Sequence, residues 1–233
     1  MSSPLERLRG GLIVSVQAES DSVLNTPEAI ALLARCAAAN GAAALRIEGA
    51  ARIAAVRAAL PDTPLIGIVK RVHAGFDPYI TSTHEEIEAV GQAGADLVAF
   101  DATARPRAGG LSVPAAIAVA RAAGLIVMAD CSEEADASAA IEAGADIVAT
   151  TLAGYTPPTL GRSLPALELV AFIAARHPFA ICEGGVGQPA EAAAAFAAGA
   201  SAVVVGTAIT NIDVLVRRFV VASPRAHPVP PRF

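Results

Sequence analysis

Cysteine is scarce in this chain, and its three cysteines lie far apart. Cys36, Cys131 and Cys182 stand in apolar or helical surroundings and include no pair at the C-x-x-C spacing of a metal site. An odd number of separated cysteines also excludes the disulfide framework that holds many small secreted proteins together. We therefore expect buried free thiols in a reducing compartment.

Signals for export and for membrane insertion are also missing. Residues 1–10 carry Glu6, Arg7 and Arg9 and lack the apolar core of a signal peptide. The uncharged stretch at residues 192–212 is long enough to cross a membrane, but glycine, serine and threonine interrupt it. It is more typical of a helix end, a turn, a strand and a loop. We expect a cytoplasmic protein with no membrane partner.

Positive charge does not dominate the sequence. Acidic residues outnumber basic ones by 22 to 17, the net charge is −5, and the basic residues do not cluster. Nothing therefore suggests a nucleic-acid partner. Only 17% of the residues are charged and 54% are hydrophobic, which argues against disorder and favours helices packed closely on a sheet.

Three short repeats divide the chain. The segments Ala-Gly-Ala-Asp at 93–96 and 143–146, and Ala-Gly-Ala-Ser at 198–201, each precede a run of aliphatic residues. In each repeat we expect glycine to end a helix in the left-handed conformation, and a short loop to lead into a buried strand. Strands that alternate with helices in this way indicate βα units and a parallel sheet.

Eight such units can be counted. The pattern predicts strands at residues 12–17, 43–46, 65–70, 97–101, 125–130, 147–150, 179–183 and 202–205. It predicts helices at residues 27–39, 50–59, 83–93, 113–123, 132–143, 165–176, 189–198 and 211–220. The α/β class and the 233-residue length fit a single (β/α)8 TIM barrel domain over residues 1–233, of the phosphate-binding type. The alternative, an open doubly wound sheet, lacks the expected G-x-G-x-x-G after the first strand.

Polar or ionisable residues close nearly every predicted strand. In a barrel these strand ends meet at one mouth, where the reaction site lies. Lys70 is there a candidate base or Schiff-base former, and its alternative is a surface lysine that extends into water. Asp101 and Asp130 could instead cap helices, and Arg46 could form a surface ion pair. The strand-end residues are Gln17, Arg46, Lys70, Asp101, Asp130, Thr150 with Thr151, and Glu183.

Glycine-rich segments follow the last two predicted strands. Glu-Gly-Gly-Val-Gly occupies residues 183–187, and Val-Gly-Thr-Ala occupies residues 205–208. Without side chains, glycines let backbone N–H groups approach an anion closely. The loops after strands seven and eight hold a substrate phosphate in many barrels, so we expect one here. Glycines that merely form turns are the alternative.

Two polar loops border the expected mouth. The loop at residues 71–81 contains aromatic residues and could close over a sugar. In the loop at residues 152–164, Tyr155 could hydrogen-bond substrate or merely cover the mouth. His73 and His84 have no partner at ligand spacing, so we expect exposed loop histidines and no metal site.

Eight segments that span nearly the whole chain carry a family resemblance. They are residues 10–17, 66–71, 76–81, 101–103, 128–130, 150–156, 183–184 and 205–210. Together they resemble the N-acetylmannosamine-6-phosphate 2-epimerase family of sialic acid and amino-sugar catabolism. The resemblance implies a homodimeric barrel that interconverts N-acetylmannosamine 6-phosphate and N-acetylglucosamine 6-phosphate without a cofactor.

The resemblance also implies roles for single residues. Lys70 corresponds to the family's catalytic lysine and Glu183 to its partner carboxylate. The implied sugar-binding positions are Gln17, Arg46 and Asp130, and Thr150 and Tyr155 are further candidates for binding the substrate. The implied phosphate-binding positions are Gly184, Gly185, Gly206 and Thr207.

Two positions depart from the family pattern. The family usually has a basic residue after the Ala-Ile-Thr segment, where this chain has Asn211. Gly185 stands in place of an asparagine that is common after Glu-Gly. We therefore expect one cation and one side-chain hydrogen bond near the phosphate to be missing, although the backbone donor at residue 185 remains.

The family's substrate places the reaction at C2 of the sugar. In the open-chain form C2 lies next to the C1 carbonyl, so its proton can be removed to give an enolate and returned on the other face. The hypothesis is that Lys70 removes and returns this proton while Glu183 assists across the site. Lys70 must be neutral for this, and burial or nearby Arg46 could lower its pKa.

Two other functions fit parts of the pattern. A lyase would use Lys70 to form a Schiff base with a keto-sugar phosphate, and borohydride would trap that adduct. A non-catalytic phosphosugar-binding barrel would be expected to lose its ionisable strand ends, yet Lys70, Glu183 and Asp130 all remain. Pentulose-phosphate epimerases share the fold but usually need a metal, and no His/Asp cluster is evident in the sequence.

Overall fold

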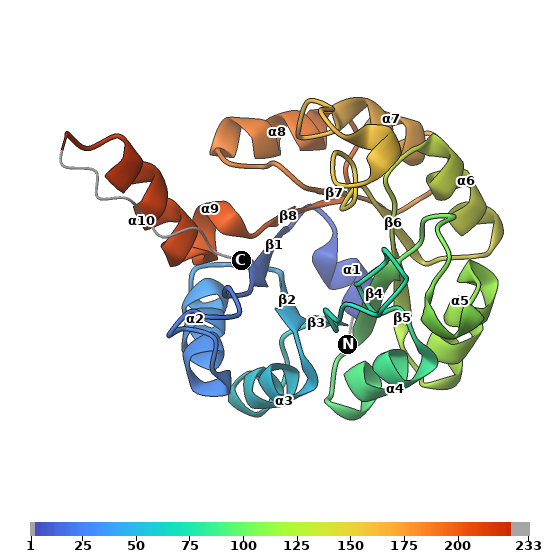
Figure 1. The fold of residues 1–233 in the computed structure, drawn as a ribbon, viewed down its shortest axis with the longest axis horizontal. Coiled ribbons are helices and arrows are strands. Elements are labelled where there is room, and N and C mark those ends of the chain that lie inside the picture. The colour runs from blue at the N-terminus through green and yellow to red at the C-terminus, as the bar shows by residue number, and fades with distance from the viewer. Residues whose placement is uncertain (1–2, 225–233) are drawn as a thin grey trace.

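The chain forms a closed barrel of eight parallel strands (Figure 1). The computed structural model describes residues 3–224, and the strands follow chain order around the barrel until β8 pairs with β1. Their bounds are β1 (Leu12–Val16), β2 (Ala44–Glu48), β3 (Leu65–Ile68), β4 (Leu97–Asp101), β5 (Ile126–Asp130), β6 (Ile147–Ala149), β7 (Ala180–Glu183) and β8 (Ala202–Val205). The predicted (β/α)8 fold is confirmed. The predicted single domain over 1–233 includes residues 1–2 and 225–233, which lie outside the described residues.

Helices alternate with the strands and cover the outside of the barrel (Figure 1). Several begin at the expected caps: the Thr26 hydroxyl accepts a hydrogen bond from the Ala29 N–H, and Thr83 forms a capping box with Glu86. Across residues 3–224, no helix is long and apolar enough to cross a membrane. The helices are α1 (Pro4–Leu8), α2 (Pro27–Ala39), α3 (Ala50–Ala59), α4 (His84–Gln92), α5 (Val113–Ala122), α6 (Glu134–Glu142), α7 (Leu167–Ala174), α8 (Pro189–Ala197), α9 (Thr207–Thr210) and α10 (Ile212–Val221).

Two of these helices, α1 and α9, are absent from the sequence prediction. They contain five and four residues, too few for a hydrophobic period to show. α1 nevertheless shows which end of the barrel is closed, because its Leu5 and Leu8 pack against the side chains of the barrel interior. It closes the N-terminal end of the strands, so the C-terminal ends remain open.

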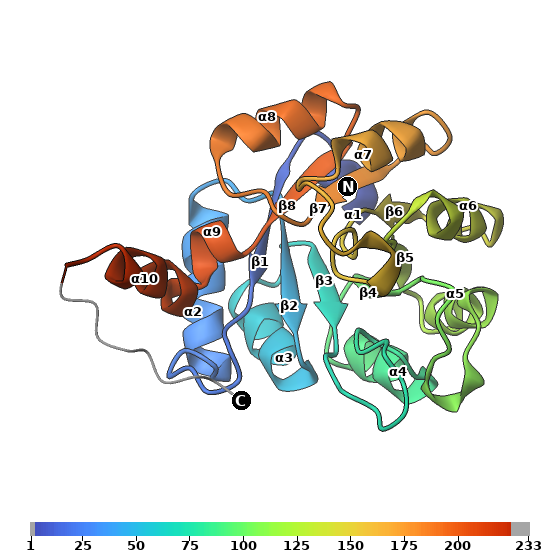
Figure 2. The same ribbon diagram turned by 45° about the horizontal axis from the view of Figure 1, so that its top comes forward.

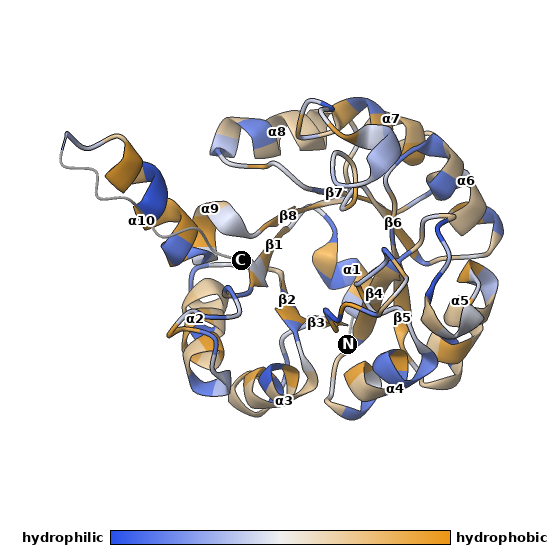
Figure 3. Cartoon of the chain, in the orientation of Figure 1, coloured by the Kyte–Doolittle hydropathy of each residue, from blue (hydrophilic) through white to orange (hydrophobic). Residues whose placement is uncertain are grey.

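Side chains along each strand alternate between the barrel interior and the surrounding helices. Figure 3 shows the strands as mostly hydrophobic and the helices as mixed. Because the alternation has a period of two, it also decides which polar strand-end residues enter the mouth. The interior positions include Ile13, Ala44, Ile66, Leu97, Met128, Ile147, Ile181 and Ala202. The positions that pack against the helices include Val14, Leu45, Val98, Val127 and Val148.

The aspartates of the Ala-Gly-Ala-Asp repeats join neighbouring strands at the closed end of the barrel. Asp96 precedes β4, and its Oδ2 accepts hydrogen bonds from the Leu65 N–H of β3 at 2.9 Å and from Arg57 at 2.6 Å. Asp146 precedes β6 and accepts a hydrogen bond from the Val127 N–H of β5 at 2.9 Å. Each repeat thus bonds its strand to the preceding one.

Two strands, β2 and β3, end two residues away from the prediction, and both differences lie at the mouth. β3 ends at Ile68, and Lys70 instead forms an isolated antiparallel bridge with Ile80. The loop between these two residues therefore leaves the mouth and returns to it. β2 continues past Arg46 to Glu48, so both side chains lie on the interior side of the strand. The other boundaries match the prediction or shift by one or two residues.

The chain after β8 leaves the barrel. α10 extends away from the strands in both views (Figures 1 and 2), and none of its side chains is buried. The three cysteines are free, and Cys131 and Cys182 are buried as predicted. Cys36 is exposed instead, because it lies on the side of α2 opposite the buried Ile30 and Ala34.

Candidate active site

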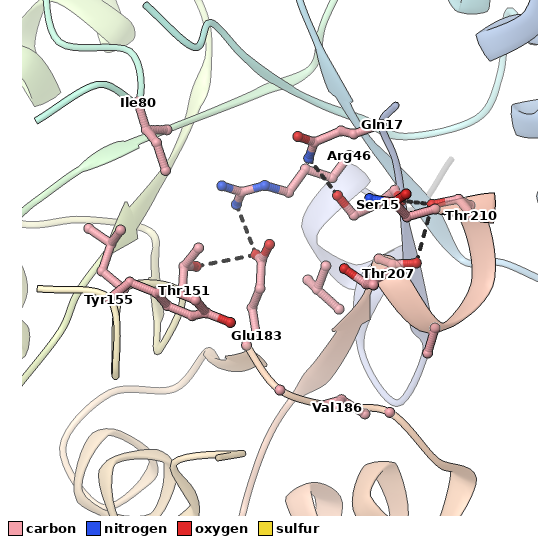
Figure 4. A pocket seen from close by; sticks show the side chains of 18 of the residues that line it. Ser15, Gln17, Arg46, Ile80, Thr151, Tyr155, Glu183, Val186, Thr207 and Thr210 are labelled. Atoms are coloured by element: carbon pink, nitrogen blue, oxygen red, sulfur yellow. Dashed lines mark hydrogen bonds and ion pairs between the residues drawn. The ribbon is translucent and has the colours of Figure 1, made fainter. Parts of the chain in front are cut away.

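A cavity of about 640 Å³ opens at the C-terminal ends of the strands (Figure 4). It collects side chains from strands that are distant in sequence, as expected for a barrel mouth. Among the described residues that line it are most of the predicted site residues: Gln17, Arg46, Lys70, Tyr155, Glu183, Gly184, Gly185, Gly206 and Thr207. Asp130 and Thr150 do not line it.

Arg46 holds two carboxylates at the base of this arrangement. Its Nη2 donates to Asp130 Oδ2 at 2.7 Å, and its Nη1 lies 3.2 Å from Asp130 Oδ1 and 3.0 Å from Glu183 Oε2. Burial opposes the guanidinium charge, but the two carboxylates raise the pKa of Arg46 on balance, so it stays cationic. Asp130 is fully buried behind Arg46 and orients it. The aspartate predicted to bind sugar therefore acts on the cavity through Arg46.

Thr151 links the same two carboxylates. Its hydroxyl donates to Asp130 Oδ1 at 2.6 Å and lies 3.2 Å from Glu183 Oε2. A hydroxyl has one proton, so it can donate to only one carboxylate at a time. While the Thr151 hydroxyl donates its proton to Asp130, its oxygen can accept a hydrogen bond from a protonated Glu183. The geometry therefore accommodates Glu183 in its neutral form.

Two ionisable groups in the cavity have pKa values displaced toward neutrality. Burial raises the pKa of Glu183 to about 7, with help from the Asp130 charge and against the attraction of Arg46. Partial desolvation lowers the pKa of Lys70, and the Arg46 charge lowers it further against the opposing effect of Glu183. Lys70 is nevertheless exposed toward the open cavity, and within residues 3–224 its ammonium group has no hydrogen bond or ion pair. A reactant can therefore reach it.

Lys70 and Glu183 stand on opposite sides of the mouth. Lys70 follows β3 and Glu183 ends β7, four strands apart in a closed barrel of eight. A molecule placed between them would meet a basic nitrogen on one face and a carboxyl group on the other. This pair of groups suits proton transfer to both faces of one carbon.

Gln17 and Ser15 form the wall on the β1 side (Figure 4). Gln17 Nε2 donates to Ser15 Oγ at 2.7 Å, and both residues line the cavity. Ser15 is absent from the sequence prediction, although it lies two residues before Gln17 on the same face of the chain. The alternation from Gln17 is the signal that could have found it.

Thr150, predicted to bind substrate, does not line the cavity, whereas its neighbour Thr151 does. The Thr150 side chain is buried between strands, where its hydroxyl donates to the Glu183 carbonyl at 2.9 Å and accepts from the Glu183 N–H at 3.1 Å. Thr151, the next residue, continues the alternation of Ile147 and Ala149 past the end of β6 and faces the cavity. Thr150 is therefore placed to fix the backbone of Glu183, and the structure does not bring it to the substrate side.

Tyr79 and Ile80 reach the cavity from the loop after Lys70 and are not singled out by the sequence. The bridge between Lys70 and Ile80 places them at the mouth. Burial raises the pKa of Tyr79, and the charges of Asp101 and Asp130 raise it further, so its hydroxyl remains a hydrogen-bond donor. Asp101 is engaged elsewhere, because Arg105 and Thr103 bind its two carboxylate oxygens.

The two glycine-rich segments form the remaining wall, and their backbone donors are available. Gly184 and Gly185 have φ values of 106° and 75°, which favour glycine. Their loop and the start of α9 line the cavity together. Within residues 3–224, no hydrogen-bond acceptor is recorded for the N–H groups of Gly185, Val186, Thr207 and Ala208. Free N–H groups from two adjacent loops are suited to an anion.

Leu164 explains why residue 185 has no side chain. A Cβ at Gly185 would lie 2.2 Å from the Leu164 Cβ, and Leu164 lies in the loop between β6 and α7. Asn211 does not contribute a charge to the cavity; its Oδ1 accepts a hydrogen bond from the Val214 N–H and caps α10. Residues 3–224 contain no group of three or more His, Cys, Asp or Glu side chains placed to hold a metal ion.

Replacing Gly185 with alanine should destabilise the protein more than the same change at Gly187. The new Cβ at Gly185 would collide with Leu164 at a positive φ, whereas at Gly187 it would meet only Glu191 Oε2 at 3.5 Å. We expect Gly185→Ala to lower the free energy of unfolding by about 1–3 kcal/mol, and Gly187→Ala to have a smaller effect. Urea denaturation measures both. Equal losses would contradict the steric role of Leu164.

Comparison with known proteins agrees with this geometry. A family model described as "Putative N-acetylmannosamine-6-phosphate epimerase" matches residues 30–224. A protein of Synechococcus elongatus named "Putative N-acetylmannosamine-6-phosphate 2-epimerase" is 46% identical over 221 residues, covering 94% of this chain and 95% of the relative. A Yersinia pestis protein of the same name is 45% identical over 213 residues, covering 91% and 90% of the two chains.

Solved structures extend the likeness to the fold. The N-acetylmannosamine-6-phosphate 2-epimerase from Clostridium perfringens is 33% identical, with a TM-score of 0.91 over 95% of this chain and 97% of its own. A 3-hexulose-6-phosphate synthase is 24% identical, with a TM-score of 0.61 over 85% of this chain and 91% of its own, and shares the fold alone. The family match over most of the chain, together with the two curated relatives, shows that the chain belongs to the N-acetylmannosamine-6-phosphate epimerase family.

Proposed function

We propose that this protein is an isomerase that interconverts N-acetylmannosamine 6-phosphate and N-acetylglucosamine 6-phosphate by epimerisation at C2. Membership of the family supports the substrate pair. The observation that carries the chemistry is the placement of Lys70 and Glu183 across one cavity, with pKa values displaced in opposite directions. The glycine-rich wall of the same cavity supports a phosphorylated substrate.

Lys70 is the base in this proposal. In the open-chain sugar the C2 proton is acidified by the adjacent C1 carbonyl. When the neutral Lys70 amine takes this proton, the C2–H electron pair forms a C1–C2 double bond and negative charge moves to the C1 oxygen. The lowered pKa of Lys70 increases the fraction of neutral amine, and its exposure toward the cavity leaves it free to act.

Glu183 serves the opposite face of C2. Its raised pKa keeps a useful fraction of the carboxyl group protonated near neutral pH, and transfer of that proton to C2 gives the other epimer. In the reverse direction Glu183 is the base and Lys70, once protonated, is the acid. Arg46 lies 3.0 Å from Glu183, and its fixed positive charge is suited to stabilise the enolate oxygen.

The other lining residues position the sugar in this proposal. Gln17 and Tyr155 supply polar groups at the cavity wall, and Tyr79 adds a hydroxyl donor. The backbone N–H groups around Gly185 and Thr207 hold the phosphate. Holding both ends of the open-chain sugar places C2 between Lys70 and Glu183.

Deuterium exchange tests the assignment of Lys70. Proton NMR of the wild-type protein with N-acetylmannosamine 6-phosphate in D2O, with a chelator present, should show the gluco epimer carrying deuterium at C2. Lys70→Ala should reduce turnover by ~10²–10⁴-fold because the base is lost. Near-normal turnover of Lys70→Ala would remove Lys70 from the mechanism.

The same material separates the two alternative functions. A lyase acting through a Schiff base would leave a borohydride-trapped adduct on Lys70, and an epimerase would not. A phosphosugar-binding protein without catalysis would bind the substrate and show neither C2 exchange nor an adduct. Wild-type turnover with C2 deuteration is therefore expected only from the proposed epimerase.

The pH dependence of kcat/KM should be bell-shaped in both directions. In one direction Glu183 must lose its proton to act as base, and in the other Lys70 must lose its proton. In both directions the active form of the pair carries one proton in total. When pH drops below about 7, the value for Glu183, both groups are protonated and activity falls. Above the lowered pKa of Lys70 both groups are deprotonated, and activity falls again. In the direction in which Lys70 donates the proton, the residual activity of Glu183→Gln should lack the fall below pH about 7, and an unchanged profile would contradict the role of Glu183.

We infer a homodimer from the surface of α10. Ile212, Val216 and Phe219 recur at helical spacing on this helix and are 45%, 53% and 79% exposed. An apolar stripe on a helix that projects from the barrel gains free energy when a second copy of the chain covers it. Phe219→Glu should lower the mass measured by light scattering to that of a monomer. The matched change Leu32→Glu, at an exposed position on α2, should leave the mass unchanged; equal behaviour would contradict this interface.

The cytoplasmic location stays a prediction.

A further inference from the structure

The phosphate end of the cavity has few sources of positive charge. Three cationic residues are found among the described residues that line the cavity: Arg46, Lys70 and Arg218. Arg46 is engaged by Asp130 and Glu183, and Lys70 acts as the base in the proposed reaction. A phosphate monoester carries nearly two negative charges at neutral pH. Arg218 is thus the lining cation without another assigned task.

The position of Arg218 on α10 allows it to reach the glycine-rich wall. Asn211 caps α10 and lines the cavity together with Thr207. Arg218 follows Asn211 by seven residues, or about two helical turns, so both lie on one side of the helix, roughly 10 Å apart along its axis. Helical side chains lean toward the N-terminus, and an arginine is long enough to cover much of that span. The Arg218 side chain therefore returns toward the cavity.

The acidic side chains at this end of the cavity already have partners. Glu19 is paired with Arg217, the residue next to Arg218. Glu191 Oε2 accepts hydrogen bonds from the N–H groups of Gly187 and Gln188 at 2.6 and 3.0 Å. Within residues 3–224, Arg218 itself has no recorded hydrogen bond or ion pair, in contrast to Arg217. Within the described residues, Arg218 is therefore left without a recorded partner, beside free backbone donors.

We propose that Arg218 binds the substrate phosphate and supplies its counter-charge. The planar guanidinium can donate two parallel hydrogen bonds to phosphate oxygens, and the N–H groups of the two glycine-rich segments bind the others. This inference rests on the proposed function for the identity of the substrate. It adds a binding residue from the helix that follows the barrel, outside the strand-end loops.

Kinetics of matched arginine variants test the assignment. Arg218→Ala should raise KM for N-acetylmannosamine 6-phosphate by roughly 10–100-fold, because a charged hydrogen-bonding group is lost, and should change kcat much less. Arg218→Lys should recover part of the loss. Arg35→Ala removes the same charge from an exposed side chain on α2 that does not line the cavity, and should change KM less than about 3-fold. Equal KM values for the two alanine variants would overturn the proposal.

Inorganic phosphate gives a readout that does not depend on turnover. Calorimetric titration should show weaker phosphate binding to Arg218→Ala than to wild type or Arg35→Ala. If the wild-type protein fails to epimerise but this order holds, the proposed reaction is wrong and the phosphate site stands. If epimerisation occurs and the three proteins bind phosphate equally, the reaction stands and the role of Arg218 is wrong. Light scattering confirms that the compared variants share one oligomeric state.

Discussion

The buried guanidinium of Arg46 holds the cavity together. It contacts both oxygens of Asp130 and one oxygen of Glu183, so three strands are joined at the barrel mouth. Two carboxylates at one site repel each other, and the shared cation makes their proximity possible. Removing that cation would leave two buried acids facing each other, a far more costly arrangement than an exposed broken pair.

Strand alternation explains how much of the site the sequence could predict. The barrel follows from eight βα repeats, and the polar strand ends then locate Gln17, Arg46, Lys70 and Glu183 at the mouth. The same reasoning fails between Thr150 and Thr151, because a shift of one residue moves a side chain from the interior to the outer face. β6 ends at Ala149, one residue before its predicted end, and an error of one residue is enough to choose the wrong threonine.

Other features depend on contacts between segments that the sequence pattern does not pair. Leu164 excludes a side chain at Gly185, although the two residues belong to different βα units. The buried position of Asp130 behind Arg46 likewise requires the closed barrel. α10 begins close to its predicted position, but its projection away from the strands, and hence the proposed position of Arg218 beside the cavity, could not be read from its hydrophobic period.

Arg46 lowers the pKa of both proposed proton-transfer groups, with desolvation at Lys70 and against it at Glu183. Its charge disfavours protonated Lys70 and thus lowers the pKa of that amine, in the same direction as desolvation. For Glu183 it favours the ionised form and opposes the stronger effect of burial, which Asp130 reinforces. Without Arg46, burial would raise the pKa of Glu183 further and leave the pKa of Lys70 higher. The same guanidinium therefore increases both the fraction of neutral Lys70 and the fraction of ionised Glu183, which are the forms that act as base in the two directions of the reaction.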